Sequence, residues 1–437
     1  MFLKQRAKKL IHFLFAWYSY IRYGRPSRKL IVVGVTGTKG KSTCCRLIAS
    51  VLEAGGYKVG MLTTVEFQIG DQRSPNDKKM TMLGRGQIQK MLRDMVKAGC
   101  RYAVVETSSE GILQYRHYGL NYDVAVFTNL GTEHSERHGG FANLKKAKGK
   151  LFAALSYSPP KIIAGKKIPK VAVVNSDDKN AGYFLDFPAD EKFTFGNISP
   201  ASSGRHFTAK IIRSNDCGVD FEVNNKSFHL NIIGEFNVYN SLAALIVGRS
   251  QNISDEKISA GLASVKLVAG RMEFVDAGQP FKVVVDYAHE SISLTALFTS
   301  LRRLSAPHGG KIISVIGSDG GGRDVQKRGR MGEVAGSLTD LVVITDVNCF
   351  DEDPKQIAEM LAKGARMAGK KDGVDLFIEV DRRKAIALSL SLAKMGDVVA
   401  ITAKGTEPVI CVANGKRIPW DDRKVARELL REKLDRN

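Results

Sequence analysis

Short apolar runs alternate with amphipathic stretches along most of the chain. Stretches with the apolar spacing of a helix include 42–54 and 86–97. The apolar runs are rich in β-branched residues and predict strands at 30–35, 102–105, 123–127, 171–174, 283–285, 312–316 and 341–344. Because strands that alternate with helices form largely parallel sheets, this pattern predicts an α/β protein.

The alternation of predicted strands and helices changes at two places, which suggests a division into domains. Residues 157–235 contain short alternating stretches, such as 221–223 and 228–232, which predict an antiparallel patch inside the first domain. A boundary is expected at 267–270. We therefore expect an N-terminal segment at 1–29, a larger domain at 30–267 and a smaller domain at 268–437.

The N-terminal segment is basic and aromatic. Its apolar run, 11–21, is flanked by Lys and Arg on both sides and is too short to span a bilayer, which needs about twenty apolar residues. No small-residue cleavage site follows the run, so a signal peptide is not expected. Two interpretations remain open. The run forms either a helix in the interface of an anionic membrane, with Trp17 at headgroup level, or a helix packed on the protein's own body.

Charge and cysteines narrow the class of partner. The formal net charge is +21, and residues 1–30 hold eight basic residues and no acidic ones, so anionic ligands are favoured. No zinc finger, RNP pattern or basic stripe with interleaved aromatics occurs, so a nucleic-acid partner is not expected. The six cysteines form no CxxC pair, which favours buried thiols in a reducing cytoplasm: Cys44, Cys45, Cys100, Cys217, Cys349 and Cys411.

The glycine-rich stretch 34–43 predicts a phosphate-binding loop. It follows a predicted strand and opens a predicted helix, so backbone N–H groups and the helix N-terminus point at an anion. Lys41 suits the β- and γ-phosphates of ATP, and the Ser42 hydroxyl suits Mg²⁺. The strict P-loop pattern fails, because Val35 stands where its first glycine belongs. Glu106, at the carboxyl end of strand 102–105, is placed to hold the same Mg²⁺.

Further motifs run in order from about residue 31 to 425. They lie at 36–43, 106–109 with Gln114 and Arg116, 128–130 with Glu133, His134, His138 and Gly139, 147–152, 234–244, 270–273, 286–289 and 404–407. Together these segments resemble the Mur ligases, the ATP-dependent amide ligases of peptidoglycan synthesis. Within that family they are most similar to the MurE branch, which adds the third residue of the stem peptide.

The resemblance implies a fold and a reaction. The fold would be a P-loop-type central ATPase domain with a mainly parallel sheet, followed by a smaller Rossmann-like α/β domain. In the reaction, a substrate carboxylate attacks the γ-phosphate of ATP, and an amine then displaces phosphate from the acyl phosphate. Cationic shielding of the two anions would come from Lys41 and two Mg²⁺ ions. The first ion would be held by Ser42 and Glu106, and the second by His134 and by Lys148 after carbamylation.

The resemblance also implies which residues contact the ligands. The catalytic set would be Lys41, Glu106, His134 and Lys148. The nucleotide would be bound by Gly37, Thr38, Lys39, Gly40, Lys41, Ser42, Thr43, Asn237, Asn240, Arg271 and Asp286. A muramyl-peptide-like carboxylate and an amino acid would contact Thr81, Ser108, Ser109, Gln114, Arg116, Asn348, Lys404 and Glu407.

Three departures from the family pattern bear on the substrate. Only about thirty residues precede the ATP loop, so we expect the UDP-gripping N-terminal domain to be missing and consider a lipid-linked or polymer-bound precursor. The motif D-N-P-R is replaced by residues 347–350, where Phe350 stands for the arginine, which argues against a diaminopimelate acceptor. The motifs K-G-H-E and S-S-H read Lys-Gly-Thr-Glu at 404–407 and Ser-Ser-Glu at 108–110.

Several functions remain open at this point. The leading one is a cytoplasmic ligase of cell-wall precursor synthesis, with membrane contact through 1–28 if the first helix is interfacial. A second is a related ligase with another acceptor, of the folylpolyglutamate or cyanophycin type. A third is a nucleotide-binding partner subunit that does not ligate.

Overall fold

The protein is described here by a computed structural model. It describes residues 1–437 except 1, 79, 132–134, 200–204, 323–324 and 435–437. The chain divides into two compact units, Met1–Lys266 (unit 1) and Leu267–Asn437 (unit 2), which are described separately below.

Unit 1 is built on a large, mostly parallel sheet, which is nine-stranded among the described residues. Seven of its strands pair in parallel with their neighbours, and the antiparallel meander β2–β3–β4 completes one edge. In spatial order the strands are β11 (Arg205–Phe207), β10 (Glu191–Phe195), β9 (Val171–Asn175), β6 (Val124–Phe127), β1 (Ile31–Thr36), β5 (Tyr102–Glu106), β2 (Val59–Leu62), β3 (Glu66–Ile69) and β4 (Gln72–Pro75).

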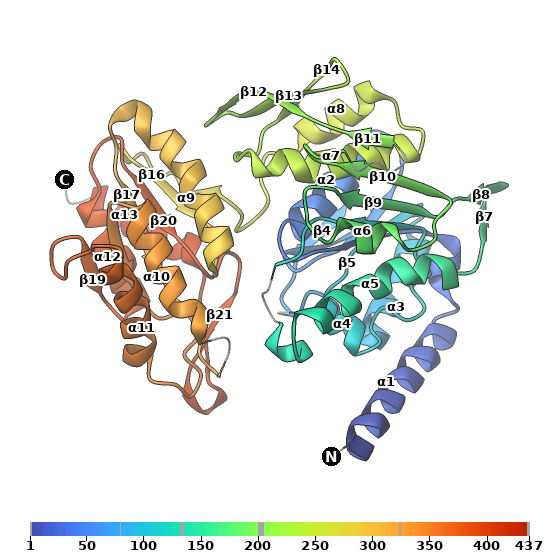
Figure 1. The fold of residues 1–437 in the computed structure, drawn as a ribbon, viewed down its shortest axis with the longest axis horizontal. Coiled ribbons are helices and arrows are strands. Elements are labelled where there is room, and N and C mark those ends of the chain that lie inside the picture. Colours follow the sequence, from blue (N-terminus) through green and yellow to red (C-terminus); the bar gives the residue numbers. More distant parts are fainter. Residues whose placement is uncertain (1, 79, 132–134, 200–204, 323–324, 435–437) are drawn as a thin grey trace. The chain divides into compact units, whose positions relative to one another are not determined.

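Helices cover both faces of this sheet (Figure 1). One face carries α2 (Lys41–Ala54), α7 (Phe236–Ser250) and α8 (Asp255–Ser264). The other carries α3 (Arg85–Lys97), α4 (Ser109–Leu113), α5 (Phe141–Tyr157) and α6 (Ala181–Leu185). Strands β1, β5 and β6 are buried along their whole length, as their continuous apolar runs predict for a sheet covered on both sides. The predicted α/β class is confirmed.

The region 157–235 is only partly antiparallel. It contains the hairpin β7 (Lys161–Ile163) and β8 (Lys166–Ile168) and the antiparallel sheet β12 (Lys210–Asn215), β13 (Gly218–Val223) and β14 (Lys226–Leu230). Between these, however, β9, β10 and β11 extend the main parallel sheet. The expectation of an antiparallel patch was therefore right for 210–230 and missed the parallel strands inside the same region.

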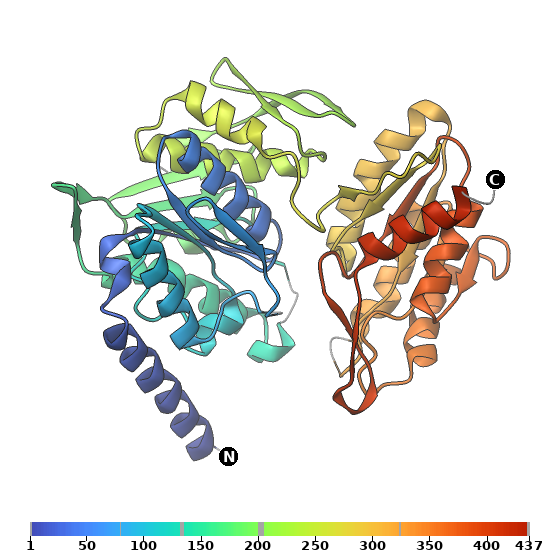
Figure 2. The same ribbon diagram turned by 180° about the vertical axis from the view of Figure 1, so that it is seen from behind.

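The N-terminal segment forms α1 (Phe2–Arg22), followed by the 3₁₀ turn η1 (Pro26–Lys29). One side of α1 packs on α3 and on the loop after α4, and both views show the helix extending from this side of unit 1 (Figures 1 and 2). In the described part of the chain, no helix is both long and apolar enough to cross a membrane.

Unit 2 is a second α/β layer structure. Among the described residues its sheet has the order β15 (Glu273–Phe274), β16 (Lys282–Val285), β20 (Val398–Ile401), β17 (Ile312–Ile316), β18 (Leu341–Ile344) and β19 (Leu376–Ile378). All neighbours pair in parallel except the short β15. The helices are α9 (Ser291–Ser305), α10 (Gln326–Leu338), α11 (Pro354–Met367), α12 (Arg382–Leu392) and α13 (Asp422–Leu434), and β21 (Val409–Cys411) and β22 (Arg417–Pro419) form a separate hairpin.

Candidate functional site

The glycine-rich loop joins the carboxyl end of β1 to the N-terminus of α2. Lys41 is the first residue of α2, and its Nζ donates 2.9 Å to the carbonyl oxygen of Thr38, which folds the lysine back over the loop. Gly40 precedes the helix in the left-handed conformation, with φ 80°. A helix N-terminus that carries a lysine and two following hydroxyls, Ser42 and Thr43, is suited to bind phosphate.

Two glycines of this loop are required by close approach. A Cβ on Gly37 would lie 1.9 Å from Thr128 Oγ1, and a Cβ on Gly40 would lie 2.4 Å from Asn240 Oδ1. The strand-end residue Asn129 completes the cradle, because its Oδ1 accepts from the Lys39 N–H at 2.9 Å. The loop is therefore held in shape by contacts with β6 and α7 as well as by its own sequence.

Ser42 and Glu106 lie together at the carboxyl edge of the sheet. Because β1 and β5 pair in parallel with Val35 opposite Glu106, the carboxylate lies beside the start of α2. Ser42 Oγ donates 2.7 Å to Glu106 Oε2, and the Thr64 N–H donates 2.8 Å to the same oxygen. Thr64 Oγ1 in turn bonds Thr81 Oγ1 at 2.9 Å, which brings this predicted substrate residue into the same network.

Lys148 also reaches the phosphate loop. It lies on α5, is buried, and its Nζ donates 2.6 Å to the carbonyl oxygen of Gly37. Its neighbour Lys150 is exposed, so the two lysines of one helix have different environments. The other predicted ligand of this metal, His134, lies outside the described residues, as does Glu133.

Asn237 and Asn240 lie in the first two turns of α7 and are both buried. Asn240 Nδ2 donates 3.0 Å to Asn237 Oδ1, and Asn237 Nδ2 donates 2.7 Å to the carbonyl oxygen of Ile233. Because α7 begins at Phe236, the pair is part of the helix itself. The contact of Asn240 with Gly40 places the start of α7 next to the phosphate loop.

The predicted substrate residues after β5 form a second polar cluster. Ser108 caps α4 by accepting from the Gly111 N–H, and Ser109 beside it is buried. Gln114 Oε1 accepts from Arg116 Nη2 at 2.7 Å, and Arg85 Nε donates 2.8 Å to the Gln114 carbonyl oxygen. Arg85 was not predicted from the sequence, because this arginine at the start of α3 belongs to none of the motifs described above.

The two guanidinium groups of this cluster make it electropositive. Burial lowers the pKa of Arg116, with the Glu110 carboxylate acting in the opposite direction, and burial followed by the charge of Arg116 lowers the pKa of Arg85. Two partly desolvated cations held close together favour an anion, such as a carboxylate or phosphate of a substrate.

Unit 2 brings Arg271 and Asp286 into one corner. Asp286 accepts from the backbone N–H groups of Met272 and Ala288, both at 2.7 Å, and so fixes the turn that follows Arg271. The Arg271 guanidinium lies 4.5 Å from the centroid of the Tyr287 ring, a cation–π contact that orients the arginine.

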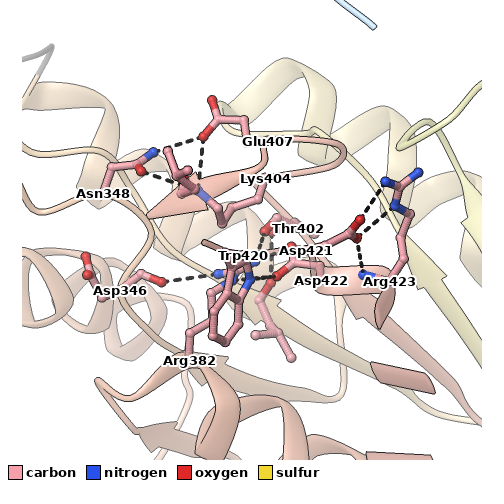
Figure 3. A network of polar contacts seen from close by, with 12 residues as sticks. Asp346, Asn348, Arg382, Thr402, Lys404, Glu407, Trp420, Asp421, Asp422 and Arg423 are labelled. Atoms are coloured by element: carbon pink, nitrogen blue, oxygen red, sulfur yellow. Dashed lines mark hydrogen bonds and ion pairs between the residues drawn. The ribbon is translucent and has the colours of Figure 1, made fainter. Parts of the chain in front are cut away.

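Three predicted substrate residues meet in one network of unit 2 (Figure 3). Lys404 is fully buried, and its Nζ bonds Glu407 Oε2 at 3.0 Å, Asn348 Oδ1 at 3.3 Å and the Val409 carbonyl oxygen at 2.9 Å. Asn348 Nδ2 donates 3.1 Å to the same Glu407 oxygen. Burial lowers the pKa of Lys404, and the nearby Glu407 acts in the opposite direction.

Backbone strain accompanies this network. Met272, Phe350 and Ala403 adopt positive φ values of 43°, 52° and 81°, a conformation that costs free energy in residues with a side chain. Each is adjacent to a predicted site residue or motif: Arg271, the stretch 347–350 and Lys404.

The donor set fits Mg²⁺ at one place. Ser42 and Glu106 offer a buried hydroxyl and carboxylate oxygen beside the phosphate loop, and Mg²⁺ prefers such oxygen ligands. Within the described residues, no group of three or more His, Cys, Asp or Glu side chains is arranged to hold a metal. The Ser42–Glu106 pair therefore fits an ion that takes its remaining ligands from nucleotide and water.

Each of the two units matches a known protein family. The Mur ligase middle domain matches residues 35–248, and the Mur ligase glutamate ligase domain matches residues 270–405.

Named relatives match nearly the whole chain. UDP-N-acetylmuramyl-tripeptide synthetase of Roseiflexus sp. (strain RS-1) is 38% identical over 418 residues, which are 94% of this chain and 80% of the relative. The diaminopimelate-adding UDP-N-acetylmuramoyl-L-alanyl-D-glutamate ligase of Geobacillus kaustophilus is 36% identical and covered to 81%. A solved structure of a ligase of the latter name is 28% identical, with a TM-score of 0.59 over 93% of this chain and 79% of that one.

Proposed function

The chain belongs to the Mur ligase family, and we propose that it is an ATP-dependent ligase that adds an amino acid to a peptidoglycan precursor. Ligases of this family use ATP and Mg²⁺, and the relatives named above are peptide ligases of cell-wall synthesis. We place the reaction in the cytoplasm, where ATP is available.

The proposed reaction has two steps. A carboxylate oxygen of the precursor attacks the γ-phosphorus of ATP, the bond to the bridging oxygen breaks, and ADP leaves. The amine of the incoming amino acid then attacks the acyl carbon, phosphate leaves, and the nitrogen loses a proton. Because the first step joins two anions, it needs positive charge fixed around the phosphates before reaction.

The observation that carries the proposal is the group of side chains around the phosphate loop. Lys41 and the N-terminus of α2 supply positive charge for the phosphates. The buried Ser42–Glu106 pair would hold Mg²⁺, which neutralises phosphate charge when bound. Asn237 and Asn240 are close enough to the loop to support the nucleotide base.

We further propose a second metal position and a carbamate. Lys148 is buried against Gly37 beside the loop, and carbamylation would turn its ammonium into a carboxylate-like ligand. His134 would share that position by family correspondence. Lys148 is buried beside the phosphate loop whereas Lys150 on the same helix is exposed, which favours Lys148 over Lys150 as the converted lysine.

The acceptor and donor are assigned to separate clusters. We propose that Arg116 and Arg85, with Gln114, Thr81, Ser108 and Ser109, bind the precursor, because this cluster is electropositive. We propose that Asn348, Lys404 and Glu407 of unit 2 bind the amino acid. Phe350 follows Asn348 where the family arginine would stand, so an acceptor without a second carboxylate is expected. Arg271 and Asp286 would contact the nucleotide.

Phosphate release tests the proposal. The full chain is incubated with ATP, Mg²⁺, a muramyl dipeptide precursor and single amino acids, and the product is identified by mass spectrometry. Phosphate release that depends on both precursor and one amino acid, with an added amide mass, supports the ligase. ATP binding without amino-acid-dependent turnover on soluble and lipid-linked muramyl peptides would favour the partner-subunit alternative instead. Peripheral membrane contact through 1–28 is a separate proposal, since it depends on α1.

A further inference from the structure

Helix α1 carries an apolar surface that unit 1 does not cover. We define this exposed α1 face by residues that are apolar or aromatic and solvent-exposed: Leu10, Ile11, Leu14, Phe15, Trp17, Tyr18 and Ile21. Phe15 is 63% exposed and Trp17 47%, and the positions recur at the three- and four-residue spacing of one helix side. A continuous aromatic stripe of this kind marks an interaction site more often than a scattered exposed residue does.

The opposite face anchors α1 to the body of unit 1. Ala16 and Ser19 are buried, and the Phe13 ring lies edge-on to Tyr118 with centroids 4.9 Å apart. Tyr20 Oη accepts 2.9 Å from Asn121 Nδ2, and the Arg93 guanidinium of α3 lies over the Tyr23 ring. The helix is therefore held in place by contacts, and its exposed apolar face is presented outward by a fixed scaffold.

Basic residues outnumber acidic residues next to this face. The sequence has four basic residues at 4, 6, 8 and 9 and no acidic residue in 1–30. At the end of the helix and just beyond it, Arg22, Arg25, Arg28 and Lys29 are exposed. On the adjoining helix α3, Lys90 and Lys97 are exposed, and Lys90 forms an ion pair with Asp94 at 3.8 Å. The apolar stripe is thus flanked by positive charge, which complements an anionic surface.

We propose that the exposed α1 face docks unit 1 on an anionic lipid bilayer. The helix would lie in the interfacial plane, with Leu14 and Phe15 below the headgroups, Trp17 at headgroup level and the basic residues among the phosphates. Trp and Tyr favour this depth because their rings are apolar and their polar atoms reach water. This goes beyond the ligase proposal and does not depend on it, because docking requires no turnover.

A bilayer accounts for both features of the surface. A second copy of the chain would bring eight basic residues per copy together across the same stripe, which disfavours the pairing by like-charge repulsion. An anionic bilayer takes up the apolar stripe and the positive charge at once. Self-association is therefore an outcome that the experiment must separate from docking.

Vesicle flotation of the full chain tests the proposal. The chain should float with vesicles of phosphatidylcholine mixed with phosphatidylglycerol and stay at the bottom with phosphatidylcholine alone. The triple variant Leu14→Ser, Phe15→Ser, Trp17→Ser should lose at least about tenfold of the binding, because it removes most of the buried apolar area. Arg22→Glu with Arg28→Glu should abolish the preference for anionic vesicles.

Matched controls separate docking through the exposed α1 face from nonspecific adsorption to vesicles. Tyr157→Ser with Ile162→Ser removes two side chains that are 84% and 76% exposed elsewhere in unit 1, and should leave flotation unchanged. Trp17 and Trp420 are the two tryptophans of the chain, so a blue shift on anionic vesicles that disappears in Trp17→Phe reports Trp17 entering the bilayer. Trp17→Phe itself should still float.

Three results would overturn the proposal. The first is wild-type chain that fails to float with anionic vesicles. The second is a Leu14→Ser, Phe15→Ser, Trp17→Ser variant that floats like wild type. The third is light scattering that shows a dimer of wild-type chain and a monomer of the triple variant, with no vesicle binding by either, which would assign the face to self-association. Thermal unfolding of the variants checks that each is folded.

Discussion

Ser42 Oγ lies 2.7 Å from Glu106 Oε2, and this hydrogen bond joins the start of α2 to the end of β5. The two residues are 64 positions apart in the chain and meet because β1 and β5 are neighbours in register. The two oxygens both stabilise the local fold through this hydrogen bond and are suited to bind Mg²⁺. A substitution in this pair therefore tests the proposed mechanism most directly.

Replacing the carboxylate should remove most of the activity. Glu106→Gln keeps the shape and can still bond Ser42, but it removes a negative charge from the metal position. We expect ATP-dependent turnover to fall about 100-fold or more, as for loss of a preorganised electrostatic group. Phosphate release across a Mg²⁺ titration measures this effect. Glu191→Gln, at an exposed residue on β10, should leave the rate unchanged; equal rates in the two variants would contradict the role of Glu106.

Lys148 should respond differently from its neighbour on α5. Lys148→Ala should abolish turnover, and short carboxylic acids should restore part of it by replacing the carbamate oxygens. Lys150→Ala, which changes an exposed lysine of the same helix, should retain activity. Rates with and without acetate measure the rescue. Full activity of Lys148→Ala without any added acid would remove the carbamate from the mechanism.

Alanine substitutions at Gly40 and Gly56 separate the cost of a positive φ from the effect of a steric clash. Both have positive φ, but a Cβ on Gly40 would lie 2.4 Å from Asn240 Oδ1, whereas a Cβ on Gly56 would meet nothing within 4 Å. Gly56→Ala should cost about 1 kcal/mol of stability and leave ATP affinity intact. Gly40→Ala should lower ATP affinity at least tenfold as well. Denaturant unfolding and fluorescent-nucleotide titration give the two quantities, and equal ATP affinities would show that the loop tolerates the displacement.

The buried lysine of unit 2 should be important for stability. Lys404→Met leaves Glu407 and Asn348 without their shared cation, and removal of one partner from a buried ion pair costs about 3–5 kcal/mol. The matched change Lys416→Met, at an exposed position beside β22, should cost little. Thermal unfolding compares the two variants. A small loss in Lys404→Met would mean that the network is placed there for ligand binding alone.

Acid should weaken the loop that supports α1. Burial lowers the pKa of His117 to about 4, and the charge of Lys150 acts in the same direction. The folded chain therefore binds this proton less tightly than the unfolded chain, whose histidine titrates near pH 6.5. Stability from this residue is complete above pH 6.5 and is lost as the pH falls toward 4, by up to about 3 kcal/mol. His117→Gln should flatten the dependence between pH 6.5 and 4 in denaturant titrations; an unchanged slope would assign it to other groups.

Much of the ATP site could be predicted from the order of the motifs and predicted elements along the sequence. A glycine-rich turn between an apolar run and a helix predicts a phosphate loop, and an acid after the next buried strand predicts a partner at the same sheet edge. Lys148 was different, because only the family motif distinguished it from the exposed Lys150. Thr64 and Arg85 could not be found from the sequence, since the meander after β2 and the start of α3 bring them to the site.

The placement of α1 also could not be decided from the sequence. The helix has aromatic or apolar residues on both faces, so a hydrophobic pattern alone could not say which side is covered. The structure shows Phe13, Ala16 and Tyr20 packed on unit 1 and Phe15 and Trp17 exposed. The expectation of a helix packed on the protein's own body is confirmed for one face, and the membrane interpretation remains a proposal for the other.

The contact between α1 and the loop after α4 would couple the two proposed binding events. Phe13 packs on Tyr115 and Tyr118, and Arg116, proposed to bind the precursor, lies between these tyrosines in the chain. If a bilayer restrains α1, it also restrains this loop. Precursor binding then costs less conformational entropy, because the loop is already ordered. Thermodynamic reciprocity requires that precursor binding strengthen bilayer affinity by the same factor. The enzyme would thereby gather on membranes most strongly when its substrate is abundant.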